Sequence, residues 1–271
     1  MMISSLINRV TRLGPRPAPR ARPGPTRLPR RAAAATAVAL GLAAVPAGAE
    51  PPAPLTVVEL FTSQGCSSCP PADAFLAELA ARPDILALSL HVDYWDYLGW
   101  QDVYAMPAFT RRQVAYGEAA GARSVYTPQM VVQGRARLVG SHRDEAIAAI
   151  HAIADEPRAA AITLTLHEDA LEVRVTPLAD PAPAGVLWFV PFHSPEPLLI
   201  DRGENAGQEI AYRNVARSWM KLGKWDGRDE AVFSAPVPSD SPGHDTSGAG
   251  VAVILQESGI GPVIAAARLE Y

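Results

Sequence analysis

Cysteine is almost absent from this chain, which has only two among its 271 residues, Cys66 and Cys69. No second Cys-x-x-Cys pair and no His-x-x-x-His motif accompanies them, so the sequence lacks the set of four ligands that is typical of a structural zinc site. A framework of several disulfide bonds is excluded for the same reason. Sulfur chemistry in this protein therefore depends on one pair of thiols.

Acidic residues are absent from the first 49 positions, where eight arginines occur. An apolar run of 14 residues, Ala32–Val45, follows the arginines and ends in Pro46-Ala47-Gly48-Ala49. This run is too short to span a bilayer, and the whole pattern predicts a secretory signal peptide over residues 1–49. We expect export to the periplasm, where disulfides persist. The pair Arg30-Arg31 leaves the choice between Sec and twin-arginine export open.

A basic surplus is also absent once the signal peptide is removed. The remaining 16 basic and 28 acidic residues give a net charge of about −12. This charge disfavours nucleic acids and anionic membrane surfaces as partners. No later apolar run is long enough to cross a membrane, so we expect no membrane attachment after cleavage. About 220 residues remain, which is enough for one large domain or two ordinary ones.

The segment from residue 50 to residue 158 predicts alternating strands and helices. Apolar runs at Leu55–Phe61 and Ile85–Val92 are typical of buried strands. Helices are expected after the cysteines, over 107–120 and over 142–154. With two short strands after residue 125, the predicted order is β-α-β-α-β-β-α.

The two cysteines stand between the first predicted strand and a helix that we expect to begin near Ser67. Residues three apart lie on one helix face, so Cys66 and Cys69 can form a disulfide with each other. The positive end of the helix macrodipole lowers the pKa of a nearby thiol. We therefore predict that Cys66 is the nucleophile and that Cys69 is the buried resolving thiol.

Two alternatives to redox chemistry stay open for this pair. A structural disulfide in a binding or scaffold protein is the first, although closing a four-residue loop stabilises by only about 2 kcal/mol, against about 4.7 kcal/mol for a loop of about a hundred residues. A metal carrier that uses Cys66, Cys69 and a histidine is the second. His91, at the end of the second predicted strand, is a candidate for tuning a thiolate or binding a metal, or is simply hydrogen-bonded there.

From residue 159 onward the apolar residues alternate with polar ones. Ile162, Leu164 and Leu166 alternate with threonines, and the same period of two recurs around Val173. About seven strands are expected, separated by polar turns, with a polar loop over Ser234–Gly250. We predict an all-β, sandwich-like C-terminal domain over residues 159–271.

Three motifs resemble an exported bacterial family of unknown function on a thioredoxin-like scaffold. They are Leu60–Asp73 with its Cys-Ser-Ser-Cys-Pro-Pro-Ala-Asp core, His91–Asp96, and Tyr126-Thr127-Pro128-Gln129. The resemblance implies an α/β thioredoxin-like domain over residues 50–158, in which Cys66 matches the nucleophile and Cys69 the resolving cysteine.

The same resemblance implies roles for three further residues. Pro128 matches the proline that is cis in thioredoxin-like proteins, and Thr127 before it would pair through its backbone with a substrate strand. Glu59 matches a buried acid that would take the proton of Cys69, an exposed acid being the alternative. Gly65 stands where thioredoxin has tryptophan, and Ser-Ser separates the cysteines, so the direction of electron flow stays open.

Aromatic residues are concentrated in the loop after the second predicted strand. This loop contains Trp95, Tyr97 and Trp100, which either line a groove for an unfolded peptide or pack between elements. On the helix that follows, Arg111 and Arg112 are expected on a solvated face.

We predict an exported thiol–disulfide oxidoreductase that needs no metal and no cofactor besides the redox-active disulfide. Its expected partners are protein thiols and disulfides or a redox partner protein.

Overall fold

Residues 53–168, 170–236 and 248–270 are described by the structure, a computed structural model of the chain. The predicted signal peptide, residues 1–49, lies outside these ranges. Within them, no helix is both long and apolar enough to cross a membrane.

The first part of the described chain alternates strands and helices. The continuous apolar runs form strands that are buried along their whole length, as expected for strands covered on both faces. In chain order the elements are β1 (Thr56–Thr62), α1 (Pro70–Ala80), β2 (Ile85–His91), the 3₁₀ helix η1 (Asp96–Leu98), α2 (Pro107–Ala119), β3 (Gln129–Val132), β4 (Ala136–Val139) and α3 (Arg143–Ala154).

The second part consists of strands. Two of them, β11 and β12, lie where the sequence predicted none, and the predicted polar loop begins inside β12, with residues 237–247 outside the described ranges. The strands are β5 (Ala160–Leu166), β6 (Ala170–Pro177), β7 (Gly185–His193), β8 (Leu198–Leu199), β9 (Glu209–Ile210), β10 (Val215–Ala216), β11 (Met220–Trp225), β12 (Ala231–Pro236), β13 (Gly250–Glu257) and β14 (Val263–Glu270).

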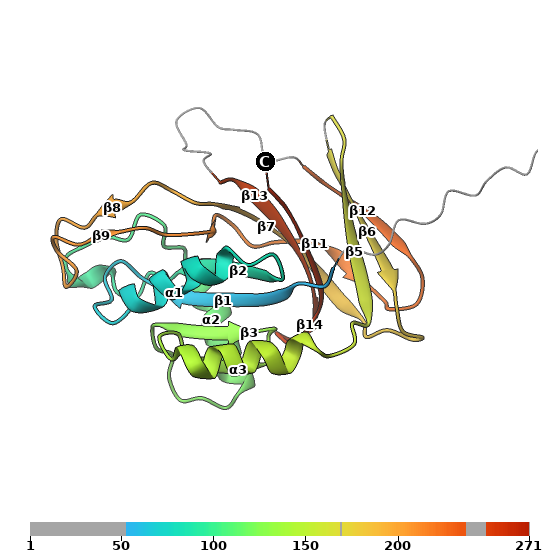
Figure 1. Cartoon of the computed structure of the whole chain (residues 1–271), viewed down its shortest axis with the longest axis horizontal. Coiled ribbons are helices and arrows are strands. Elements are labelled where there is room, and N and C mark those ends of the chain that lie inside the picture. Colours follow the sequence, from blue (N-terminus) through green and yellow to red (C-terminus); the bar gives the residue numbers. More distant parts are fainter. Residues whose placement is uncertain (1–52, 169, 237–247, 271) are drawn as a thin grey trace, which may run out of the picture. The chain divides into compact units, whose positions relative to one another are not determined.

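Strands from both parts share one nine-stranded sheet of order β14-β13-β7-β10-β2-β1-β3-β4, with β11 also paired to β7 (Figure 1). The two parts join where Val215 of β10 pairs with Ser89 of β2. A boundary near residue 158 therefore does not separate two sheets. The thioredoxin-like and sandwich-like assignments and the division into two domains stay predictions.

Both faces of the large sheet are covered. Val57 and Phe61 of β1 face α2, where Phe109 belongs to the same core, whereas Val58 and Leu60 face α1 and α3. This alternation follows from the pleat of a strand, which points successive side chains to opposite faces. It decides on which side of the sheet each polar residue of β1 lies.

A second, three-stranded sheet of order β12-β6-β5 packs against the large one. Ile162 and Val173 of this sheet share a core with Leu187 of β7 and Val253 of β13. Strands β8 and β9 form a separate two-stranded ribbon. Ile200, the residue after β8, packs against Trp100 and against Tyr212, which precedes β10. This ribbon carries a loop that returns to the cysteines.

Candidate active site at the start of α1

The carboxyl ends of β1 and β2 position the candidate site. The two strands are parallel and in register, with Thr62 opposite His91, so both end at the same edge of the sheet. Residues 63–69 then lead from β1 into α1. In open α/β sheets this edge is the usual place for a functional site.

Cys66 and Cys69 form a disulfide with a Cα–Cα distance of 5.4 Å, as the spacing allowed. The helix begins at Pro70 and not near Ser67, because the two prolines occupy the first helical positions, where a missing N–H is tolerated. Cys69 is the N-cap residue, and its amide closes a turn to the carbonyl of Cys66 (3.1 Å). The macrodipole falls off within one turn, so it acts on Cys69 more directly than on Cys66.

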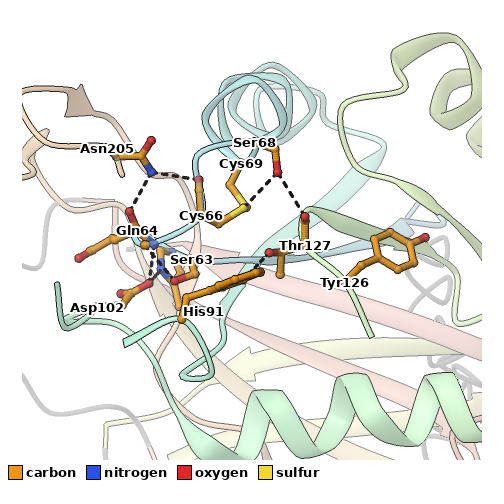
Figure 2. The surroundings of a disulfide bond; sticks show 12 residues. Ser63, Gln64, Cys66, Ser68, Cys69, His91, Asp102, Tyr126, Thr127 and Asn205 are labelled. Atoms are coloured by element: carbon orange, nitrogen blue, oxygen red, sulfur yellow. Dashed lines mark hydrogen bonds and ion pairs between the residues drawn. A yellow bond between two sulfur atoms is a disulfide. The ribbon is translucent and has the colours of Figure 1, made fainter. Parts of the chain in front are cut away.

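Ser68 connects the disulfide to Thr127. Its hydroxyl lies 3.4 Å from Cys66 Sγ and donates to the carbonyl of Thr127 at 3.4 Å (Figure 2). The peptide bond between Thr127 and Pro128 is cis. The structure therefore brings together four residues that the sequence singled out: both cysteines, Thr127 and Pro128.

The three predicted aromatic residues occupy different positions. Trp95 Nε1 donates to Thr127 Oγ1 at 2.7 Å, which ties the aromatic loop to the cis peptide. Trp100 Nε1 donates instead to Gln64 Oε1 at 2.7 Å, in the turn before Cys66. Tyr97 is 76% exposed and stacks on Trp95 with a centroid distance of 6.4 Å. A peptide groove formed by these three residues stays a prediction.

Glu59 lies apart from the disulfide, and its predicted role is corrected. Its place between Val58 and Leu60 turns its side chain to the α2 face of the sheet, away from α1. There Arg112 binds both carboxylate oxygens, at 2.6 and 2.9 Å, and the hydroxyl of Tyr116 donates to it at 2.7 Å. A carboxylate held in this way serves the core of the fold.

Arg112 was expected on a solvated helix face but is buried in the Glu59 pair, with its guanidinium 3.7 Å from the ring centroid of Trp219. Burial disfavours its charge, yet the facing Glu59 carboxylate outweighs this, and the pKa of Arg112 is raised. Its neighbour Arg111 is exposed, as expected.

A second acid, Asp73, lies on the α1 side of the sheet. It is 3% exposed, follows Cys69 by one helical turn, and its amide donates to the carbonyl of Cys69 at 3.1 Å. Burial raises the pKa of Asp73 to about 7, an effect partly offset by His91. In the sequence Asp73 was noticeable as part of the family motif and as an acid in the first turn of the helix, where it suits the dipole.

His91 and Asp102 form a buried pair beside this acid. His91 Nδ1 lies 2.7 Å from Asp102 Oδ2, and both side chains are fully buried. Burial lowers the pKa of His91, but the Asp102 carboxylate outweighs it and the net pKa is raised. Burial also acts to raise the pKa of Asp102, and the facing imidazole lowers it to below its ordinary range. Asp102 also accepts from the amide of Gln64 at 2.8 Å, so the pair reaches the cysteine turn.

Asn205, from the loop between β8 and β9, covers the cysteine turn. Its side-chain amide donates to the carbonyls of Gln64 (2.8 Å) and Cys66 (3.0 Å) (Figure 2). Cys66 is 3% exposed and Cys69 is fully buried, while Ser67 and Ser68 are exposed. Among the described residues, no three His, Cys, Asp or Glu side chains are grouped to hold a metal ion.

A family model described as "Protein of unknown function (DUF1223)" matches residues 57–256. The search of curated proteins found no match. Protein AGR_C_4864 from Agrobacterium tumefaciens is a solved structure with 30% identity and a TM-score of 0.66, over 79% of this chain and 93% of that one. HBP35 of Porphyromonas gingivalis is similar in fold alone, with 14% identity and a TM-score of 0.54 over 80% of this chain and 74% of its own. The chain therefore belongs to the DUF1223 family of proteins of unknown function.

Proposed function

We propose that this protein is an exported, periplasmic thiol–disulfide oxidoreductase on a thioredoxin-like scaffold, acting on the thiols or disulfides of other proteins. The observation that carries the proposal is the disulfide itself. Cys66 and Cys69 close a four-residue ring where β1 leads into α1, with the Ser68 hydroxyl beside Cys66 Sγ and hydrogen-bonded to the carbonyl of Thr127. The element order from β1 to α3 also supports the thioredoxin-like assignment.

The reaction needs only the two thiols of the reduced protein. The Cys66 thiolate attacks one sulfur of a substrate disulfide, forms a mixed disulfide and releases the first substrate thiolate. Cys69 then attacks Cys66 Sγ and releases the second substrate sulfur, which leaves the Cys66–Cys69 disulfide. Two electrons pass to the substrate, and the same steps in reverse oxidise a substrate dithiol.

The substrate would approach over Ser68 and Thr127. Ser67 and Ser68 are exposed beside the buried sulfurs, and Tyr126, 39% exposed, precedes Thr127 in the chain. In Figure 2 the Tyr126 ring points away from the disulfide. Exposed aromatic rings give a peptide apolar contact area with little loss of conformational entropy.

One observation favours the second candidate, a scaffold with a structural disulfide. Cys66 is 3% exposed and Cys69 is fully buried, and inert disulfides are often inaccessible in this way. Reaction with a protein therefore requires side chains around Cys66 to move aside, and Ser68, whose hydroxyl lies 3.4 Å from Cys66 Sγ, is one of them. The two candidates differ in reduction potential, which lies below about −300 mV for typical structural disulfides.

Trapping of mixed disulfides tests the proposal. A Cys69→Ala variant keeps the nucleophile and lacks the resolving thiol, so it should accumulate mixed disulfides with proteins of the exported compartment, which reducing agents release. The matched control is the Cys66→Ala, Cys69→Ala double variant, which should capture none. Absence of adducts on Cys69→Ala, together with a potential below about −300 mV, would establish the scaffold instead.

A further inference from the structure

A cluster of buried polar groups lies between α1 and the carboxyl ends of β1 and β2. Asp73 belongs to it, and so do the hydroxyls of Thr62 and Ser89 and the imidazole of His91. The pairing of Thr62 with His91 and of Leu60 with Ser89 places these strand residues side by side. Val58 and Leu60 share this face with α1, so the cluster lies under the helix that begins at the disulfide.

Several atoms of this cluster lack a hydrogen-bond partner among the described residues. They are both carboxylate oxygens of Asp73, Nε2 of His91, and the hydroxyl oxygens of Thr62, Ser89 and Tyr212. The Thr62 hydroxyl faces the Asp73 carboxylate and lowers its pKa, but without the geometry of an ordinary hydrogen bond. Each unpaired buried polar group costs about 1–3 kcal/mol, and native proteins contain few of them. Six such atoms, two of them the carboxylate oxygens of Asp73, are therefore concentrated beneath α1.

Asp73 and Cys69 occupy the same face of α1. Side chains four apart on a helix have Cβ atoms about 5–6 Å from each other, and the hydrogen bond from the Asp73 amide to the Cys69 carbonyl confirms the helical spacing. Cys69 is fully buried, so its proton cannot pass directly to bulk solvent. Asp73 is the acid adjacent to Cys69 along this buried face.

The charges around Asp73 keep it near its titration point at neutral pH. Burial raises its pKa to about 7, and His91 opposes this. Two other titratable groups face Asp73: Asp102, which lies beyond His91, and Tyr212, from the loop before β10. Tyr104 packs against the His91 imidazole and against the ring of Tyr212. A carboxyl group poised in this way can both accept and return a proton.

We infer that Asp73 exchanges the proton of the Cys69 thiol during the resolving step, and that the His91–Asp102 pair positions and stabilises the Asp73 carboxylate. The inference rests on the proposed function and deepens it. In the mixed disulfide, the proton of Cys69 passes to Asp73, the Cys69 thiolate attacks Cys66 Sγ, and the substrate sulfur leaves with the bonding electron pair. Asp73 is then protonated and the substrate leaves as a thiolate, so atoms and charges balance; when the same steps run in reverse, Asp73 returns the proton to Cys69.

Two-phase kinetics with the aromatic disulfide dithiobis(nitrobenzoate) test this inference on the reduced protein. Attack by Cys66 releases one coloured thionitrobenzoate, and attack by Cys69 releases the second. In Asp73→Asn the first phase should stay within about twofold of wild type, while the second should slow about 100-fold at neutral pH, the lower end for lost general-base assistance. The second phase should then rise with pH as an unassisted buried thiol does, with a pKa above the value of about 8.5 for a free cysteine. Asp144→Asn, at an exposed acid in the first turn of α3, is the matched control and should behave as wild type.

The outcomes separate the two proposals. A normal first phase with a second phase whose pH profile is identical in Asp73→Asn and wild type would overturn the role of Asp73 and leave the oxidoreductase intact. Absence of the first phase in wild type would overturn the oxidoreductase and the proton exchange with it. Infrared spectra of wild type give a test without a variant: near neutral pH a buried carboxylic acid band should change between the disulfide and dithiol forms, and its constancy would contradict the inference.

Discussion

Replacing Asp73 by asparagine should stabilise the folded protein, and more so at higher pH. The substitution keeps the shape of the side chain and removes its charge. Burial raises the pKa of Asp73 from 3.8 to about 7, so the folded state disfavours the ionised carboxylate that the unfolded chain carries. At 1.36 kcal/mol for each pKa unit, the difference corresponds to about 4 kcal/mol.

The sign of the pH dependence follows from the raised pKa. Below pH 3.8 the carboxyl is protonated in both states and costs nothing. Between pH 3.8 and about 7 only the unfolded chain ionises, so the stability of wild type falls as pH rises, and above about pH 7 the loss is complete. Removal of the charge should therefore contribute about 1.5 kcal/mol in favour of Asp73→Asn at pH 5 and about 4 kcal/mol at pH 8.

Urea unfolding of the disulfide form at both pH values measures this effect. Buried asparagine brings its own unpaired amide, but that cost is the same at both pH values, so the decisive quantity is the increase of about 2.5 kcal/mol in the advantage of Asp73→Asn between pH 5 and pH 8. Asp144→Asn, at an exposed acid, controls for the general loss of negative charge. An advantage that is equal at both pH values would show that Asp73 titrates as an ordinary carboxylate and would refute the reasoning.

Two further predictions concern the contacts that hold the site. Arg112→Met leaves Glu59 buried and without its charged partner, and should lower the free energy of unfolding in urea by about 3–5 kcal/mol; a loss below 1 kcal/mol would contradict the importance of this pair. Asn205→Ala removes the two hydrogen bonds to the carbonyls of Gln64 and Cys66. It should lower the free energy of unfolding by about 1–3 kcal/mol and accelerate reduction of the disulfide by dithiothreitol. An unchanged reduction rate would show that this loop does not limit access to the disulfide.

The elements around the site were predictable where their pattern was continuous. The apolar runs gave β1 and β2 to within one residue, because every side chain in them is buried and no alternation was needed to recognise them. The sequence predicted one strand over Ile210–Ala216, which the structure divides into the ends of β9 and β10, two residues each. Val215 of β10 joins β7 to β2 and unites the large sheet. Strand β11, with Lys221 and Lys224 and a register shift, forms only because β7 offers it a partner.

The site itself divides in the same way. Cys66, Cys69, Thr127 and Pro128 were recognisable because each belongs to a short motif. Asp102 lies in an aperiodic loop, and Asn205 lies in a turn more than a hundred residues beyond the cysteines. Neither position has a local pattern, since only the tertiary fold brings these side chains to the turn after β1.

Glu59 and Asp73 show why the sequence alone does not tell which buried acid faces the cysteines. Both are acids close to the cysteines in the sequence, and both are buried. The choice between them depends on the face of the sheet: Glu59 shares the α2 face with Val57, whereas Asp73 descends from α1 onto the opposite face, where Thr62 and His91 lie. Arg112 neutralises Glu59, whereas no arginine is among the described residues that shift the pKa of Asp73, and for this reason we assign the proposed proton exchange to Asp73.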